Sequence, residues 1–91
     1  MQKTLLVTLE QFRTTFHAGG LTAARIVATG NRYHAVADTK SGDRVVLVRH
    51  SDTTARAFSD PGTALKMLRE IGFMVITVDM TNWQPGQSPL N

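Results

Sequence analysis

The sequence predicts a small single α+β domain, with two helices packed on one face of a mostly antiparallel sheet of about four to five strands. Three observations predict this class. Two segments have apolar residues at helical spacing. Between them lie stretches in which apolar and polar residues alternate, separated by glycine-containing turns, and a run of β-forming residues follows the second helix. The expected order is strand, helix, three strands, helix, strand. Because both helices need one sheet face, the other face or an edge is expected to stay open to a partner.

The stretch from Phe58 to Asp79 carries the strongest structural signal, a capped amphipathic helix followed by a strand. Asp60 is the expected N-cap, and Pro61 suits the first helical position because its φ is already helical. Gly72 suits the left-handed residue that ends a helix. The expected buried positions of this helix are Ala64, Leu65, Leu68 and Ile71. The run from Phe73 to Val78 is very apolar, which predicts an interior strand.

The first helix is expected from about Leu9 to His17, after a short strand from Leu5 to Val7. Thr8 and Gln11 have the spacing of a capping box, in which each side chain bonds the backbone of the other. Gly19-Gly20 ends the helix. Its apolar side chains, expected in the core, are Leu9, Phe12 and Phe16.

The middle of the chain reads as a three-stranded meander. The expected strands run from Thr22 to Thr29, from Arg32 to Thr39 and from Arg44 to Arg49, with glycine-containing turns between them. A brief extended piece is expected from Ala55 to Phe58. Neither side of these strands is cleanly polar, so the alternation does not determine which side faces the core.

The composition fits one small domain without disulfides. The chain has 91 residues and no cysteine. We expect residues 1–81 to form the domain and residues 82–91, which lack periodicity, to form a loosely ordered tail. The apolar run near the N-terminus is too short for a signal peptide or a membrane span, so we expect a cytoplasmic protein that does not enter membranes.

No residue pattern predicts catalysis, a metal or a cofactor. His17, His34 and His50 stand 17 and 16 positions apart, which matches no local ligand spacing. The serines lack the context of a nucleophile, and Gly19-Gly20 closes a helix instead of opening one around a phosphate. We therefore expect a protein that is not an enzyme, with no cofactor and no small-molecule substrate.

The basic residues of the β region are the candidate nucleic-acid-binding surface. Ten lysines and arginines against seven aspartates and glutamates give a net charge of +3, which permits such a partner without requiring it. If the strands share a face, a cationic patch would lie beside an aromatic ring. The alternative is that these charges are ordinary solvated strand ends. The candidate residues are Arg25, Arg32, Tyr33, Arg44 and Arg49.

Trp83 is the candidate partner-binding residue. It follows the last expected strand, so it either anchors a partner or holds the tail against the domain. Three methionines are expected to fill the core: Met67, Met74 and Met80.

Two family resemblances bear on function. The segments MQKTLLVTLEQFRTTFHAGGL, FSDPGTALKMLREIGF and VDMTNW resemble small ParC-type partition-associated proteins of bacterial plasmids and integrative elements. That resemblance implies a role in stable inheritance of a mobile element. A second resemblance, to HicA-type toxins, rests on Gly30 to His34, a following strand and PGTALKMLREIGF. These toxins have a fold similar to double-stranded RNA-binding domains, and a histidine on one of their strands serves RNA cleavage. Here the expected Gly-Ser-His is replaced by Gly30-Asn31-Arg32-Tyr33-His34.

Three hypotheses follow. The first is a non-enzymatic accessory protein of a mobile element that acts by protein–protein binding, either with a protein partner or as a homodimer. The second is a nucleic-acid-binding module that uses the basic β-sheet face. The third is a HicA-like RNA-cleaving toxin in which His34 would be the catalytic residue.

Overall fold

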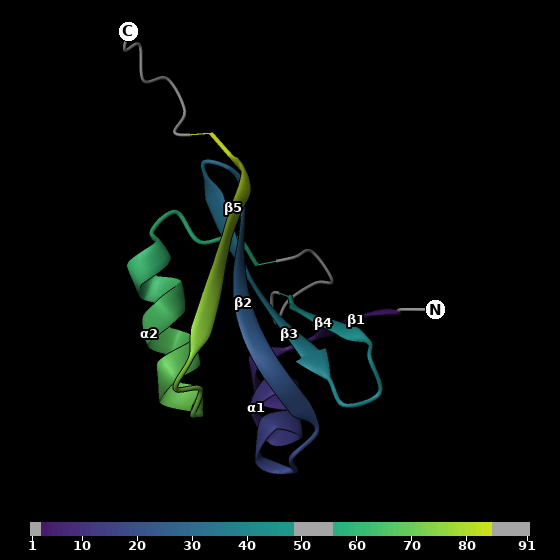
Figure 1. The fold of residues 1–91 in the computed structure, drawn as a ribbon. Coiled ribbons are helices and arrows are strands. Elements are labelled where there is room, and N and C mark those ends of the chain that lie inside the picture. The colour runs from purple at the N-terminus through teal and green to yellow at the C-terminus, as the bar shows by residue number, and fades with distance from the viewer. Residues whose placement is uncertain (1–2, 49–55, 85–91) are drawn as a thin grey trace, which may run out of the picture.

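The computed structural model describes residues 3–48 and 56–84 and contains two helices and a five-stranded sheet. The predicted α+β class and element order are confirmed (Figure 1). In chain order, the elements are β1 (Thr4–Val7), α1 (Leu9–His17), β2 (Leu21–Gly30), β3 (Arg32–Thr39), β4 (Arg44–Leu47), α2 (Pro61–Ile71) and β5 (Ile76–Trp83).

The sheet is mixed, with two antiparallel and two parallel strand pairs, where a mostly antiparallel sheet was expected. Its strand order is β1-β4-β3-β2-β5, which places β1 and β5 at the two edges. The β2–β3 and β3–β4 pairs are antiparallel hairpins, as the glycine turns predicted. The β1–β4 and β2–β5 pairs are parallel. In each pair, the connection between the two strands includes a helix, so the second strand can enter the sheet in the same direction as the first.

Both helices pack on the same side of the sheet and enclose the core. Phe12 from α1 and Leu68 from α2 are fully buried there. The alternating strand residues that face them are also buried, and they are Ala24, Ile26 and Ala28 of β2, Tyr33, Ala35 and Ala37 of β3, and Val45 and Leu47 of β4. Among the described residues, the opposite face carries no helix, and it is called the open sheet face below.

The helix boundaries follow the predicted caps. The Thr8 hydroxyl accepts the Gln11 amide at 3.3 Å, and the Gln11 side chain accepts the Thr8 amide at 2.9 Å, which completes the capping box. Asp60 accepts the Gly62 amide at 3.3 Å at the start of α2. Gly72 ends α2 with φ of 138°, a conformation that residues with a Cβ rarely adopt.

The last strand differs from its prediction in both bounds and position. It begins at Ile76, not at Phe73, and it lies at the edge of the sheet, not in the interior. The reason is that Phe73 alone turns into the core, where its ring packs on Phe16 with centroids 4.6 Å apart. The chain must then pass through Met74 and Val75 before pairing with β2, and both are largely exposed.

Several other predicted features also change or fall outside the described residues. β5 continues to Trp83, two residues beyond the expected end of the domain at residue 81. Met74 and Met80 are exposed, so their assignment to the core was wrong, whereas Met67 packs against the core. Some predictions fall outside the described residues. They concern residue 49 at the end of the third meander strand, His50, residue 55 and the tail from residue 85. Within residues 3–48 and 56–84, no helix is long and apolar enough to cross a membrane.

Candidate interaction surfaces

The open sheet face receives some of the predicted nucleic-acid-binding residues but not all. In strand register, Arg25 lies opposite Val36, and Arg44 lies opposite Asp38, so both arginines point away from the helices. Arg32 alternates with the buried Tyr33 and so leaves the same side of β3. Arg49 lies outside the described residues.

Tyr33 does not belong to this face. Its side chain is only 7% exposed and packs in the helix-side core, while its backbone bonds Phe58 on the neighbouring segment. The prediction that it would stand beside the arginines was therefore wrong, because neighbouring residues of a strand point to opposite faces. Without this ring, the predicted patch loses the aromatic surface on which a base could stack.

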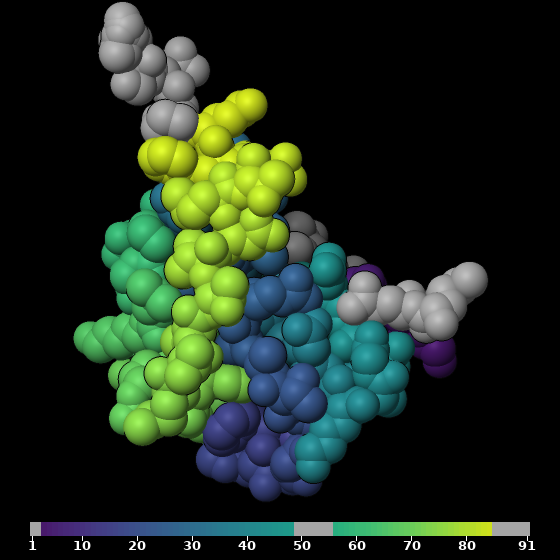
Figure 2. Space-filling view, in the orientation of Figure 1, coloured from purple at the N-terminus to yellow at the C-terminus, as the bar shows by residue number. Residues whose placement is uncertain are grey.

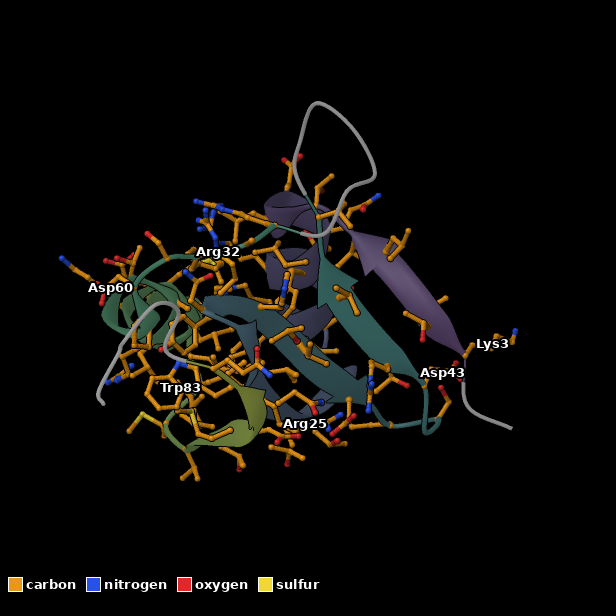
Figure 3. The ribbon with its side chains drawn as sticks, turned by 90° about the horizontal axis from the view of Figure 1, so that it is seen from above. Lys3, Arg25, Arg32, Asp43, Asp60 and Trp83 are labelled. Atoms are coloured by element: carbon orange, nitrogen blue, oxygen red, sulfur yellow. The ribbon has the colours of Figure 1, made fainter. Side chains whose placement is uncertain are left out.

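The positive charge of the open sheet face is compensated only in part. The Arg25 guanidinium bonds the Asp38 carboxylate at 2.7 Å, and Asp38 is also the cross-strand neighbour of Arg44. Arg25 and Arg44 therefore both lie near this one acid, and Arg25 forms the ion pair with it. Arg32 lies four residues along β3 from Val36, or ~13 Å at the usual rise per strand residue, and Figure 3 shows it well apart from Arg25. The positive charge of the open sheet face is therefore spread over two separate places, one at Arg25 and Arg44 and one at Arg32.

Three nitrogens on the open sheet face are buried without a hydrogen-bond partner among the described residues: Nε of Arg25, Nδ1 of His34 and Nε of Arg44. Their residues are strand neighbours of Val36 and Val46, which oppose each other across β3 and β4. Arg25 lies opposite Val36, and His34 and Arg44 stand two positions before Val36 and Val46 on the same face. Within the described part of the chain, no group of three histidine or acidic residues could hold a metal ion. The face is thus a mixed apolar and polar surface.

A second surface runs along β5 and is made of exposed apolar side chains. Met74 and Val75, just before the strand, are 76% and 82% exposed. Val78, Met80 and Trp83, within the strand, are about half as exposed, at 39–43%. These five residues are called the β5 edge surface. Figure 2 shows β5 as a continuous strip at the surface of the molecule, with α2 on one side and β2 on the other.

The register of β5 explains why its apolar residues stay exposed. Ile76 and Val78 lie beside Ala24 and Ile26 and therefore point to the helix side. However, α2 packs mainly on β2 and β3, so it covers the outermost strand incompletely. Trp83 lies beside Gly30, which has no side chain to cover it. The edge position of β5 thus converts residues that would be core in an interior strand into surface.

The backbone of this edge is unpaired on its outer side among the described residues, because β5 is the last strand of the sheet. Exposed strand edges are commonly protected by lysine or proline, and β5 contains neither. It does contain a register shift opposite Val27 and Thr29. At that point the Asp79 carboxylate accepts the Thr81 amide at 3.0 Å, so one backbone donor is already satisfied. The regular part of the edge therefore runs from Ile76 to Met80.

The Asp79 carboxyl is held in its charged form. Its pKa is lowered from the usual value, first by a hydrogen bond with the Thr81 side chain and then by the Thr81 amide, with attraction from Arg25 and Arg44 adding to the effect. At neutral pH, β5 therefore carries one fixed negative charge, since Asp79 is its only charged residue.

The opposite edge is less suited to pairing. β1 has four residues, against eight in β5. Leu5 and Leu6 are 40% and 51% exposed, so β1 is also partly apolar. At its start, the Lys3 amide bonds the Asp43 carboxylate at 3.1 Å (Figure 3). Short edge strands are a known protection against pairing, which leaves β5 as the stronger candidate.

The sequence prediction identified Trp83 in this surface but missed its other members. A signal for them was present: Ile76, Val78 and Met80 alternate with Thr77, Asp79 and Thr81, the period of a strand with two different faces. The apolar run before them obscured this alternation.

No family model, curated protein or solved structure matches this chain.

Proposed function

We propose that this protein is a non-enzymatic interaction module that binds a protein partner through the β5 edge surface. The observation that supports this proposal most directly is the row of exposed apolar side chains along a strand whose outer backbone has no partner strand in the described part of the chain. A partner strand added there would gain main-chain hydrogen bonds from the edge and specificity from the side chains. Burial of apolar surface would add ~25 cal/mol per Å².

For its cellular role, we propose an accessory function in the stable inheritance of a bacterial mobile element. The support is the resemblance of the N-terminal, α2 and β5 segments to ParC-type partition-associated proteins. An accessory protein of this kind needs a binding surface more than a catalytic site, and the β5 edge surface supplies one.

The test compares two charge substitutions at opposite edges of the sheet. Val78→Lys places a charge in the β5 edge surface, and Leu6→Lys places the same charge on the comparably exposed β1. With a photocrosslinking residue at position 84, just after β5, the full chain is expected to capture a defined partner in its host cell. Val78→Lys should reduce this capture about tenfold, equivalent to ~1.4 kcal/mol, because it charges the buried interface.

The Leu6→Lys control should capture the partner as the wild type does. Equal losses in both variants, or no loss in Val78→Lys, would contradict binding through β5.

A second candidate function is nucleic-acid binding through the open sheet face. The observation in its favour is that Arg25, Arg32 and Arg44 leave their strands on one side. This function would require affinity that falls steeply with salt, and Arg44→Ala should lower the slope of that dependence by about 1 if Arg44 contacts a phosphate. Absence of binding to DNA and RNA at low salt, measured by fluorescence anisotropy, would remove this candidate.

A further inference from the structure

We propose that the partner of the β5 edge surface is a second copy of this chain, and that the two β5 strands pair antiparallel about a two-fold axis through Val78. This inference rests on the proposed function of the edge and assigns its occupant. The axis would run perpendicular to the sheet, so that one sheet would continue through both copies with all helices on the same side.

The register follows from which part of the edge is free. The pairing segment is Ile76 to Met80, because the Thr81 amide beyond it is already bonded to Asp79. The centre of this segment is Val78. Antiparallel pairing about Val78 places Ile76 opposite Met80 of the second copy, and Val78 opposite its own counterpart. Opposed residues in a sheet share a face, so these apolar side chains would cover one another.

The single charge of β5 also selects this register. Pairing about Val78 places Asp79 opposite Thr77 of the second copy, a residue with a hydroxyl. Pairing about Asp79 would oppose two carboxylates, which repel. Pairing about Thr77 would place the carboxylate opposite the apolar side chain of Val75, with no polar group of the second copy directly across from it. Of these three registers, only the one about Val78 matches polarity at every position of the segment.

The surroundings of Thr77 add complementary charge. Thr77 lies in register with Arg25 of β2, on the open sheet face. In the proposed pairing, Asp79 of the second copy enters this same row, next to Thr77 and about two strand spacings, ~10 Å, from Arg25. Arg25 and Arg44 already attract the carboxylate of their own chain. A second carboxylate in this row would therefore lie in a favourable field.

The ends of the β5 edge surface complement each other as well. Met74 and Val75 precede the strand, and Trp83 ends it. Antiparallel pairing brings the start of one strand beside the end of the other, so the two most exposed apolar residues of one copy would approach Trp83 of the second. Pairing of β5 with β1 of another copy would instead use two different edges and would build rings or open filaments, not a two-fold dimer.

The absence of cysteine from the sequence allows a direct test with single-cysteine variants of the full chain. In Val78→Cys, the two introduced Cβ atoms would be opposed across the axis, ~4.5–5.5 Å apart, close enough for a disulfide after small adjustments. The control is Met74→Cys, which is more exposed at 76% but has its own counterpart far away in this register. Under mild oxidation, Val78→Cys should form a covalent dimer about tenfold faster than Met74→Cys, because proximity raises the effective concentration.

A second pair of variants checks the register independently. Thr77→Cys mixed with Asp79→Cys should crosslink to each other faster than either variant crosslinks to itself. Circular dichroism verifies that each variant is folded. Equal rates for Val78→Cys and Met74→Cys, together with no preference in the mixture, would overturn the inference. If those rates are equal while Val78→Lys still reduces capture of another protein about tenfold, the edge function stands and the second copy is not its partner.

Discussion

Replacement of Phe12 by alanine is expected to lower the free energy of unfolding by ~3–5 kcal/mol, the cost of removing a large buried ring. Phe12 is fully buried, and its ring meets Phe73 edge-on with centroids 6.2 Å apart. It thus links α1 to the segment that leads into β5. Small domains are typically stable by ~5–15 kcal/mol, so this change should remove a large share of the total.

Urea denaturation followed by circular dichroism measures this loss. The control is Thr14→Ala, at an exposed position of the same helix, where a change within ~0.5 kcal/mol is expected. A loss below ~1 kcal/mol for Phe12→Ala would mean that Phe12 is not part of a packed core.

Replacement of Gly72 by alanine is expected to cost ~2–4 kcal/mol, because it adds a backbone penalty to a steric one. The φ of Gly72 is 138°, and a Cβ there would lie 2.5 Å from Cε2 of Phe16. Phe16 packs on Phe73, so it has little room to move away. The substitution should therefore disturb both the end of α2 and the packing of Phe16 of α1 against the segment that follows α2.

Gly30→Ala separates these two contributions. Gly30 also has a positive φ, 62°, but a Cβ there would meet no atom within 4 Å. Its cost should be limited to the backbone penalty, ~1–2 kcal/mol. Thermal unfolding of both variants gives the comparison, and equal losses would show that the Phe16 contact contributes nothing.

The features that the sequence predicted well are local ones. The capping box of Thr8 and Gln11 spans three residues, and Asp60 bonds an amide two residues away. Both partners of such a contact lie close together in the sequence, so the helix bounds could be predicted. The parallel pairing of β1 with β4 joins residues 40 apart, such as Thr4 and Arg44, and no nearby residue encodes it.

The candidate surfaces were harder to predict because they depend on which side the helices cover. Tyr33 and Arg32 are neighbours in β3 and therefore point to opposite faces, but only packing against the helices shows that Tyr33 is the one inside. The Arg25–Asp38 ion pair joins different strands and reduces a charge excess that composition suggests. Likewise, the apolar run from Phe73 to Val78 indicated an interior strand, although Phe73 alone in this run is fully in the core, Ile76 packs against it in part, and Met74 and Val75 are exposed.

The central claim, that β5 is the binding edge and pairs with a second copy, is tested most directly by sedimentation velocity over a wide concentration range. The wild type and Leu6→Lys should both shift from monomer to dimer as concentration rises. Val78→Lys should remain monomeric at the same concentrations, because pairing would place two ammonium groups opposite each other across the axis. A wild type that stays monomeric throughout, or a Val78→Lys variant that dimerises as readily as the wild type, would contradict the claim.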